Sequence, residues 1–572
     1  MPHLTIFDSA RWRAYARGAL RDDVVAACVV SVLLIPQSLG YALLAGLPPE
    51  AGLYASLLPL LAYAAFGSSP VIGVGPVALL ALMISQAVSH GPAGVPPHAV
   101  AIVLAAEVGL LLALAAWWRL HALAALLSVP VLHGFETGAA VAIGLSQLPV
   151  LLGSTARGSS LPQLVMSWRG ATLPWWPLTA LYGAVAMLAL WVLRRRAAAW
   201  LAQVMPKQRA LLLSRLAPLA VLAAAVLAEV LTHSGDRGVV LVGALPALEW
   251  RLHAVSLDIG LWQALLPDAL PIALVAFVSS LVVAESMSRR EGTRINPRRE
   301  LAGLAAANLV AAASAGMPVA GSFTRSVVAL DAGSRTRMAG VFTAVLMGIA
   351  VLVIGRPLAL LPTAVLAATI VIASLAVFDL KPFGQAWRYD RAEAVLMTVV
   401  AVLTVLLGVA WALGVGVAAS IGLLLQRTAR PHVALIGRVP GTEHYRNAER
   451  HTVELTPGVM ALRIDESLLF TNARQLSDVV AQQLAHYPDT KRVVLQMSPV
   501  NHIDLSGLAA LRALHDLLAA RGIQLDLSEV KGPVQDALKA GEWTRWFGGE
   551  LFLSHHHAME AHATEDALRP MR

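Results

Sequence analysis

The sequence predicts an α-helical polytopic membrane protein with about fourteen spans, followed by a small cytoplasmic α/β domain. The 572 residues are 57% hydrophobic and only 14% charged, with a mean hydropathy of +0.67. A soluble protein carries about 25% charged residues. Most apolar residues in the first three quarters of the chain form runs of about 18–25, the length that crosses a bilayer core of about 30 Å. Basic residues gather on alternate loops between these runs.

The apolar runs can be placed in order along the chain. Three of them, near 74–90, 300–314 and 324–333, are short for a full span. The expected spans lie near 24–45, 51–66, 74–90, 98–118, 122–150, 175–193, 210–231, 264–288, 300–314, 324–333, 338–355, 360–378, 393–408 and 410–426.

The loop charges orient the chain in the bilayer. With the N-terminus in the cytoplasm, inner loops carry about four times as many Lys and Arg residues as outer loops. This bias favours an even number of crossings and cytoplasmic termini in the plasma (inner) membrane. The formal charge of +8 does not indicate nucleic-acid binding, because the basic residues form no stripe on a soluble face. The expected divisions are a cytoplasmic segment 1–22, a transport domain 23–428, a linker 429–449, a cytoplasmic domain 450–565 and a tail 566–572.

The chain after Gln426 reads as a soluble α/β domain. Short apolar runs at 459–464, 493–497 and 523–527 predict strands, and 473–484 and 506–520 predict helices. Asp504-Leu505-Ser506-Gly507 opens the second helix, so Asp504 or Ser506 is expected to cap it. The alternatives are a phosphate held on the helix N-terminus and phosphorylation of Ser506.

Few residues suggest catalytic or cofactor chemistry. The single Cys28 excludes an internal disulfide and a CxxC metal site. Adjacent histidines on a helix point in different directions, so His555–His557 predict a solvated tail rather than a metal site. No nucleophile–base pair or metal cluster occurs in a soluble setting. We therefore expect no enzyme activity, no metal and no cofactor.

Gly and Pro interrupt the helical pattern inside three spans. Pro36-Gln37-Ser38 lies within the first span, and Gly73-Val74-Gly75-Pro76 precedes Val77 and Ala78 in the third. In the tenth, Gly316-Met317-Pro318 and Gly321-Ser322 precede a short helix. Such breaks occur where protein or a watery cavity surrounds the backbone. The last two lie at corresponding positions of two halves, which is typical of inverted-repeat transporters with discontinuous helices.

Two facing helix N-termini predict an anion site. Each terminus carries roughly half a positive charge and free N–H donors. With Arg325 they sum to about +2 in a region of low dielectric. An arginine at mid-membrane usually faces a cavity and a partner. The alternative is that Arg325 extends to the cytoplasmic surface.

Several motifs resemble those of the SulP sulfate-permease family. The first-span stretch Pro36–Ala42, followed by Leu44–Pro49 and Gly52-Leu53-Tyr54, carries the most specific likeness. Pro130–Phe135, Asn308, Gly321–Ser326 and Asp331-Ala332-Gly333 extend it. The Asp504–Gly507 loop resembles that of a STAS domain. The resemblance covers nearly the whole chain.

The resemblance implies seven plus seven inverted repeats in core and gate bundles, often as a homodimer, with an anion pocket between the third and tenth spans. Gln37 and Thr324 would hydrogen-bond the anion, while Tyr41 and Phe323 would form an apolar wall, unless those two rings are simple helix packing. The implied pocket residues are Gln37, Tyr41, Val77, Ala78, Ser279, Phe323, Thr324 and Arg325.

The eighth span departs from the family pattern. Many relatives carry a carboxylate where this chain has Ser279, and sodium-coupled members add a hydroxyl where it has Val283. Anion binding should then need neither a proton nor sodium at that position. Glu285 lies about 240° around the helix from Ser279 and is a better partner for Arg289. We therefore expect facilitated transport or anion exchange.

Three functions remain open from the sequence. The first is a secondary transporter of small inorganic or carboxylate anions, such as sulfate, bicarbonate, chloride or dicarboxylates. The second is an anion channel or a membrane signalling protein in which the STAS domain, with a regulatory partner, does the work. The third is a nucleobase permease of the same fold, although an uncharged base does not need Arg325.

Overall fold

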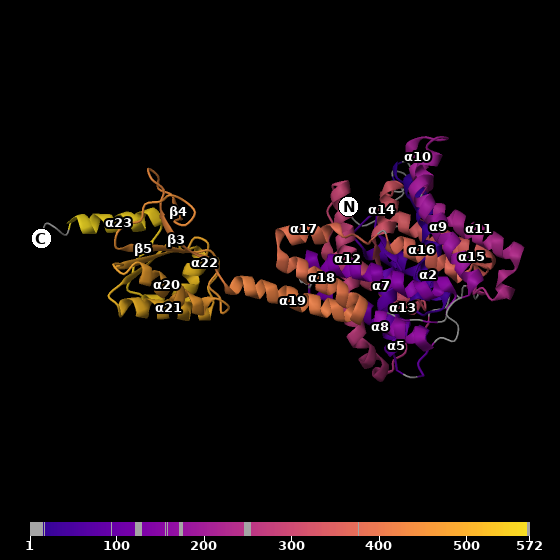
Figure 1. Cartoon of the computed structure of the whole chain (residues 1–572), viewed down its shortest axis with the longest axis horizontal. Coiled ribbons are helices and arrows are strands. Elements are labelled where there is room, and N and C mark those ends of the chain that lie inside the picture. Colours follow the sequence, from indigo (N-terminus) through magenta and orange to yellow (C-terminus); the bar gives the residue numbers. More distant parts are fainter. Residues whose placement is uncertain are drawn as a thin grey trace. The chain divides into compact units, whose positions relative to one another are not determined.

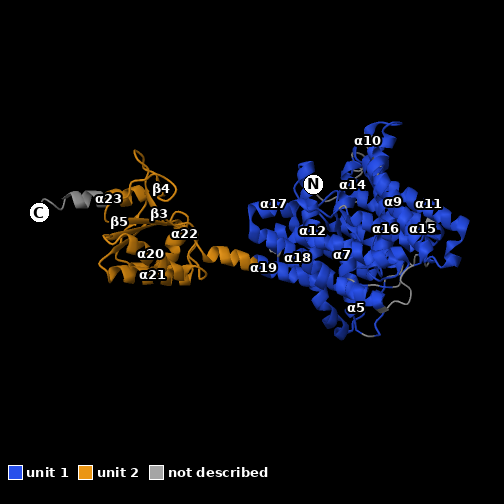
Figure 2. Cartoon of the chain, in the orientation of Figure 1, with its two compact units in different colours: residues 1–420 blue, residues 421–572 orange. Residues whose placement is uncertain are grey.

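The computed structural model describes residues 15, 18–92, 94–119, 128–154, 156, 158, 160–170, 176–214, 216–244, 253–375 and 377–568. They divide into two compact units, residues 1–420 and 421–572 (Figure 2). The first unit is helical apart from two short strands. The second is built on a sheet (Figure 1).

Where the structure describes them, the apolar runs expected to be spans each coincide with one or two helices. Residues 122–127, at the start of the fifth run, lie outside the described residues. The run 51–66 divides into α3 and α4, since Pro49 and Pro59 each occupy the first turn of a new helix. The helices are α2 Leu20–Leu44, α3 Pro49–Tyr54, α4 Leu58–Phe66, α5 Ala78–His90, α6 Pro97–Trp117, α7 Val129–Leu152, α8 Leu161–Gly170, α9 Pro177–Leu201, α10 Lys207–Ser214, α11 Ala217–Thr232, α12 Ile259–Glu291, α13 Pro297–Ala313, α14 Phe323–Asp331, α15 Met338–Ala359, α16 Thr363–Ser374, α17 Lys381–Tyr389, α18 Arg391–Leu407 and α19 Val409–Ala429. The short helices α8 and α17 lie outside the expected spans, and α10 overlaps only the start of the span expected at 210–231.

Six of these helices are long and apolar enough to cross a membrane: α2, α6, α7, α9, α12 and α19. The apolar helices α5, α11, α15 and α16 are shorter. Small residues allow close packing, as in other membrane bundles. Gly134 and Gly138 of α7 face the main-chain oxygens of Met397 and Ala401 on α18, so a Cβ at either position would collide with them. The count of fourteen crossings and the seven-plus-seven repeat remain predictions.

The second unit is a six-stranded sheet covered on both faces. The strands run in the order β4-β3-β5-β6-β7-β8, with β5 to β8 parallel and β3 antiparallel to β4 and β5. Their bounds are β3 Val433–Arg438, β4 Tyr445–Asn447, β5 Val459–Ile464, β6 Arg492–Gln496, β7 Gln524–Ser528 and β8 Leu551–Phe552. Strands β3 and β4 fall within 429–449, the stretch expected to be a linker.

Side chains alternate between the two faces of this sheet, as strand geometry requires. Leu462 and Leu495 pack with α20 (Ala473–His486), α21 (Leu505–Ala519) and α22 (Gly532–Ala540). Ala461 and Val494 face the other way, toward Ala558 and Met559 of α23 (His555–Leu568). The unit therefore has a hydrophobic core of its own.

The expectation of a solvated histidine tail is wrong for His555. This side chain is 1% exposed, and its Nδ1 lies 2.8 Å from Ser528 Oγ on β7. The reason is that α23 begins at His555 and buries Ala558 and Met559 on the sheet. The described residues hold no group of three His, Cys, Asp or Glu side chains that could bind a metal.

Burial of His555 predicts a pH-dependent stability of the second unit. Burial lowers the pKa of His555 from 6.5 to about 4, against the opposing pull of Glu529. Between these values the unfolded chain binds a proton that the folded unit excludes, so stability is complete above 6.5 and falls as the pH drops, by about 3 kcal/mol. Urea unfolding of residues 430–572 at stepped pH should show this loss, and His555→Gln should remove it. An identical pH profile in the variant would refute the assignment.

Candidate functional site

A two-stranded ribbon brings together the breaks predicted in the third and tenth spans, whereas the break predicted at Pro36 is absent, because α2 runs through this proline as one helix. Strand β1 (Gly73–Gly75) pairs antiparallel with β2 (Ala320–Ser322), with Val74 opposite Gly321. Helix α5 follows β1 and α14 follows β2. Because the strands are antiparallel, the two helices leave opposite ends of the ribbon, α5 toward the bottom of Figure 1 and α14 toward the top. Each of these helices begins directly after a non-helical segment, as the glycines and prolines of the sequence predict.

The glycines of the ribbon leave no room for side chains. A Cβ on Gly73 would lie 2.7 Å from the Cβ of Arg325, and one on Gly321 would collide with Ile72. Gly75 has a φ of +154°, which disfavours other residues. The strands therefore approach each other and α14 closely because these positions are glycine.

Polar side chains satisfy the backbone groups around the ribbon. Asn308 of α13 bonds both main-chain groups of Val319, accepting from the N–H at 2.9 Å and donating to the oxygen at 3.0 Å. Ser280 of α12 accepts from Gly321 N–H at 2.7 Å, and Ser326 of α14 accepts from Gly73 N–H at 3.0 Å. These bonds replace those that an unbroken helix would make, which is what permits non-helical backbone at membrane depth.

Arg325 lies inside the protein and does not extend to the cytoplasmic surface. It is 1% exposed, and its guanidinium donates to Pro76 O at 2.8 Å and to Gly73 O at 3.3 Å. Its Nε has no hydrogen-bond partner among the described residues, and no carboxylate there forms an ion pair with it. The charge is therefore held beside the start of α5, without an opposite charge from any side chain that the structure describes.

Gln37 is oriented by Arg325. Its Oε1 accepts a hydrogen bond from the guanidinium at 3.3 Å. The amide nitrogen, which carries two donors, then points away from the arginine. Gln37 is half-buried on α2, so these donors are available to an anion beside the ribbon.

The other expected pocket residues lie on the same elements. Tyr41 of α2 is 7% exposed and close enough to Arg325 to interact electrostatically. Val77 occupies the N-cap position of α5 without a side-chain capping bond, and Ala78 begins the helix; both are half-buried. Phe323 and Thr324 form the exposed first turn of α14. Ser279 of α12 is half-buried and donates to its own helix at Val275 O, 2.7 Å away.

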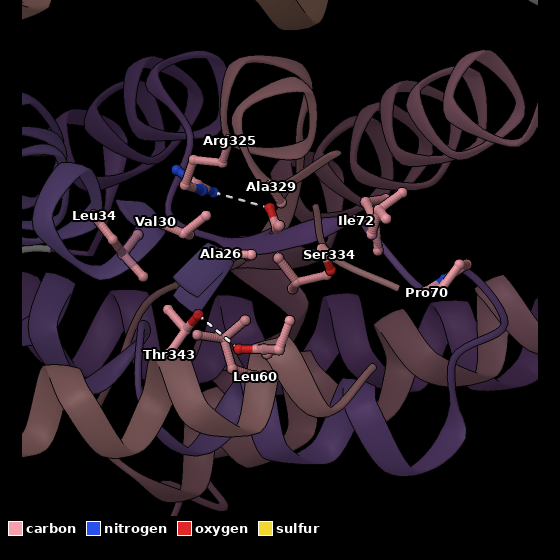
Figure 3. A pocket seen from close by; sticks show the side chains of 15 residues that line it. Ala26, Val30, Leu34, Leu60, Pro70, Ile72, Arg325, Ala329, Ser334 and Thr343 are labelled. Atoms are coloured by element: carbon pink, nitrogen blue, oxygen red, sulfur yellow. Dashed lines mark hydrogen bonds between the residues drawn. The ribbon is translucent and has the colours of Figure 1, made fainter. Parts of the chain in front are cut away.

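A small cavity of about 30 Å³ is lined in part by Arg325 (Figure 3). Its lining comes from α2, α4, α14, α15 and the ribbon, and of the expected pocket residues only Arg325 contributes. Ser334 also lines it, and both residues have a buried polar atom without a partner in the described chain. A space of this size holds one or two water molecules, so it is not where a polyatomic anion binds.

Two buried carboxylates that the sequence did not single out hold the loops next to the half-helices. Glu300 of α13 accepts from Tyr63 Oη at 2.6 Å and from Ser69 N–H at 2.7 Å, just before β1. Asp23 of α2 accepts from Arg335 N–H at 2.7 Å, after α14. Both are 0% exposed. Their signal in the sequence is a carboxylate in the first turn of an apolar helix.

In the second unit, Asp504 caps α21. Its Oδ1 accepts from Gly507 N–H at 2.8 Å and its Oδ2 from Phe470 N–H at 2.7 Å. Ser506 is exposed and is not the cap. The carboxylate already occupies donors that a phosphate at this terminus would need, although Ser506 is open to modification.

The cap predicts unequal effects for the two loop residues. Asp504→Ala should lower the unfolding free energy of residues 430–572 by about 1–2 kcal/mol, because two backbone donors lose their acceptor. Ser506→Ala should change it by less than about 0.5 kcal/mol. Urea unfolding of both variants measures the difference. Equal losses would mean that Ser506 shares the capping role.

Comparison with known proteins agrees with this architecture. A model of the sulfate permease family matches residues 20–400, and a STAS domain model matches residues 451–558. The chain is 32% identical over 559 residues to "Probable sulfate transporter 4.2" of Arabidopsis thaliana, covering 95% of this chain and 80% of that protein. It is 33% identical over 544 residues to a probable sulfate transporter of Mycobacterium tuberculosis, covering 93% of each.

Solved structures show the same fold. SLC26A9 superposes with a TM-score of 0.84 at 20% identity, over 97% of this chain and 92% of that chain. The transmembrane domain of the cyanobacterial bicarbonate transporter BicA superposes with a TM-score of 0.59 at 20% identity, over 70% of this chain and 97% of that chain. These matches confirm the expected helical membrane transporter fold with a C-terminal STAS domain. The chain belongs to the sulfate permease family of membrane-embedded transporters.

Proposed function

We propose that this protein is a secondary transporter of small inorganic or carboxylate anions that works by alternating access. The observation that supports it best is the buried guanidinium of Arg325, held beside the start of α5 with no carboxylate partner in the described chain. An uncompensated positive charge in a low-dielectric interior is costly unless an anion neutralises it. A nucleobase, being uncharged, would not offset this cost.

The proposed binding site lies between the first turns of α5 and α14. The free N–H groups near Ala78 and Thr324 would bind the anion, together with the Gln37 amide. Arg325 would act from behind Gln37, through its charge, while Tyr41 and Phe323 limit access of water. Val77 and Ser279 would complete the wall.

Sulfate is the first substrate to test, because the relatives named above are called sulfate transporters. Bicarbonate, chloride and dicarboxylates are the competitors. Where a sodium site would need a carboxylate, this chain has Ser279. Where it would need a hydroxyl, this chain has Val283. Transport should therefore be facilitated or by exchange, without sodium bound at α12.

We further propose a plasma-membrane location with both termini in the cytoplasm, based on the charge bias of the loops. A homodimer and a regulatory partner at the STAS domain, through Asp504 and Ser506, belong to the same proposal. The proposed domain boundaries of the chain are a transport domain 23–428 and a STAS domain 450–565. Deletion of residues 430–572, which removes the whole sheet, followed by measurement of flux and dimerisation, tests the role of the second unit.

Uptake into proteoliposomes tests the proposed function. Labelled sulfate uptake should saturate with concentration, be unaffected by replacing sodium, and be competed by other small anions but not by uracil. Conductance that does not saturate would instead indicate a channel. Absence of flux for every anion, with the protein folded and inserted, would support a signalling role centred on the STAS domain.

A further inference from the structure

Positive charge is concentrated where α9 ends and α10 follows it, at the upper right of Figure 1. The basic side chains there are all exposed; they are Arg194, Arg195, Arg196, Lys207 and Arg209. None of them forms an ion pair with a carboxylate in the part of the chain that the structure describes. The sequence from 137 to 228 contains no Asp or Glu. Residues 194–209, here called the basic segment, therefore keep their full positive charge.

Orientation in the membrane does not explain why acidic residues are absent here. Basic residues orient the loops, but Asp and Glu contribute little to orientation. Another basic stretch, at the end of α12, does carry carboxylates: Glu291 lies within it, and Glu285 pairs with Arg289 at 3.4 Å. A surface that contacts negative charge, by contrast, is better without carboxylates, because each of them would be repelled. The composition of the basic segment therefore fits an anionic partner.

Helix α9 brings its arginines to the boundary between lipid and water. At about 1.5 Å per residue, about 20 residues cross a bilayer core of about 30 Å, so a crossing that begins at Pro177 ends near Arg196. Trp191 and Trp200 flank the arginines and are partly exposed. Tryptophan is enriched at membrane interfaces. The guanidinium groups are therefore expected at the depth of the lipid headgroups, and α10 packs against α9 beside them.

The protein itself orients two of these arginines. The guanidinium of Arg195 lies over the ring of Trp191, 4.3 Å from the ring centroid, and the face of the ring attracts the cation. Arg194 donates a hydrogen bond of 2.8 Å to Ile372 O, near the C-terminus of α16. The basic segment is thus attached to α16 through Arg194, while its side chains remain exposed.

This attachment connects the basic segment to the helix that faces the proposed anion site. Ile370 of α16 packs on α2 at Gly40, where a Cβ would lie 3.1 Å from Ile370 Cδ1. Gly40 is on the same helix as Gln37, less than one turn away. Helices α9 and α16 also pack against each other. A ligand that fixes the end of α9 therefore acts on the surface beside α2, without contact with the transported anion.

We propose that the basic segment binds the phosphate groups of anionic phospholipids at the membrane surface where α9 ends, and that this binding supports transport by holding α16 in place beside α2. Clusters of Lys and Arg next to a transmembrane helix bind anionic headgroups. Guanidinium groups suit phosphate because they donate two parallel hydrogen bonds. The effect on flux rests on the proposed anion transport, whereas the binding of lipid does not.

Native mass spectrometry of the full-length protein in mild detergent tests the binding. The protein is offered phosphatidylglycerol and phosphatidylcholine in equal amounts. Each basic residue at an anionic surface strengthens binding by up to about fivefold, so wild type should retain phosphatidylglycerol about tenfold more strongly or better. Millimolar inorganic phosphate should not displace the lipid. The preference should be lost in a variant that keeps Arg194 and combines Arg195→Gln, Arg196→Gln, Lys207→Gln and Arg209→Gln.

A matched control removes the same charge from the end of α12 and the residues after it, by combining Arg289→Gln, Arg290→Gln, Arg294→Gln and Arg299→Gln. These side chains are also exposed, and the control should keep the preference. Arg196→Gln alone should weaken it less than the fourfold change, and this variant serves if the fourfold variant does not fold. Wild type without a preference, or equal losses in the variant and the control, would overturn the lipid site.

Sulfate uptake into proteoliposomes tests the effect on transport. In vesicles that mix phosphatidylcholine with phosphatidylglycerol, wild type and control should transport about threefold faster than the fourfold variant of the basic segment, or more. All three face the same surface potential, so the difference reports on the protein. In phosphatidylcholine alone the three rates should be equal. Equal rates in the mixed vesicles would overturn the effect on flux. Absence of uptake by wild type in both kinds of vesicle would overturn the transport proposal, while the binding result would stand.

Discussion

Replacing Arg325 with glutamine should reduce anion uptake by about a hundredfold or more. At an effective dielectric constant of about 20, a unit charge about 6 Å from a monovalent anion contributes about 3 kcal/mol, which is about a hundredfold in affinity. Glutamine keeps an amide that can donate to Pro76 O or Gly73 O, so the ribbon should persist. The loss should appear mainly as weaker anion binding.

The charge of the anion gives this prediction a second readout. A divalent anion interacts with Arg325 about twice as strongly as a monovalent one, so sulfate should lose more than chloride. Arg325→Lys keeps the charge but cannot make the same three hydrogen bonds, and it should be intermediate. Labelled uptake of both anions, with thermal stability measured in parallel, makes the comparison.

The matched control is Arg289→Gln. It removes the same charge from an exposed position near the C-terminus of α12, where Arg289 pairs with Glu285 at 3.4 Å. Uptake should change little, because a surface charge is screened by salt. If Arg325→Gln transports both anions as fast as wild type, the guanidinium does not take part in binding.

Replacing Glu300 with alanine should destabilise the membrane unit severely. The carboxylate accepts hydrogen bonds from Tyr63 Oη and from the N–H groups of Ser68 and Ser69, all near β1. Each buried donor left without an acceptor costs about 1–3 kcal/mol, so the unfolding free energy should fall by about 3 kcal/mol or more. Because Ser68 and Ser69 lead into the ribbon, the anion site should be lost as well.

Two measurements test this loss: the melting temperature in detergent and the yield of monodisperse protein. Glu300→Gln keeps one acceptor oxygen and should be intermediate. Glu285→Ala is the control, because it removes an exposed carboxylate whose pair with Arg289 is worth at most about 1 kcal/mol. A melting temperature for Glu300→Ala equal to that of Glu285→Ala would show that the network contributes nothing to the fold.

The interrupted helices were predictable because glycine and proline disturb a helix locally. Gly73–Pro76 and Gly316–Ser322 both appear as breaks in apolar runs, and Arg325 follows the second of them. The fact that Arg325 bonds the carbonyl groups of Gly73, in β1, and of Pro76, just after it, was not predictable. Its partners Gly73 and Pro76 lie 252 and 249 residues away in the sequence, and no local pattern encodes such a contact.

The same reason explains the buried carboxylates. Glu300 bonds a loop 232 residues away and Asp23 one that is 312 residues away. In the sequence each resembles an ordinary acidic residue in the first turn of a helix. In the second unit, the sequence analysis missed β3. A short apolar run does not by itself determine a strand, and β3 forms because it pairs with β5.

Anomalous scattering from selenate or bromide in crystals of the protein tests the central claim most directly. Selenate resembles sulfate and bromide resembles chloride, and both can be located without assumptions about the protein. The account predicts a peak beside the first turns of α5 and α14, within hydrogen-bond distance of the Gln37 amide nitrogen, that disappears in Arg325→Gln. A peak found only elsewhere, under conditions in which these anions compete for transport, would contradict it.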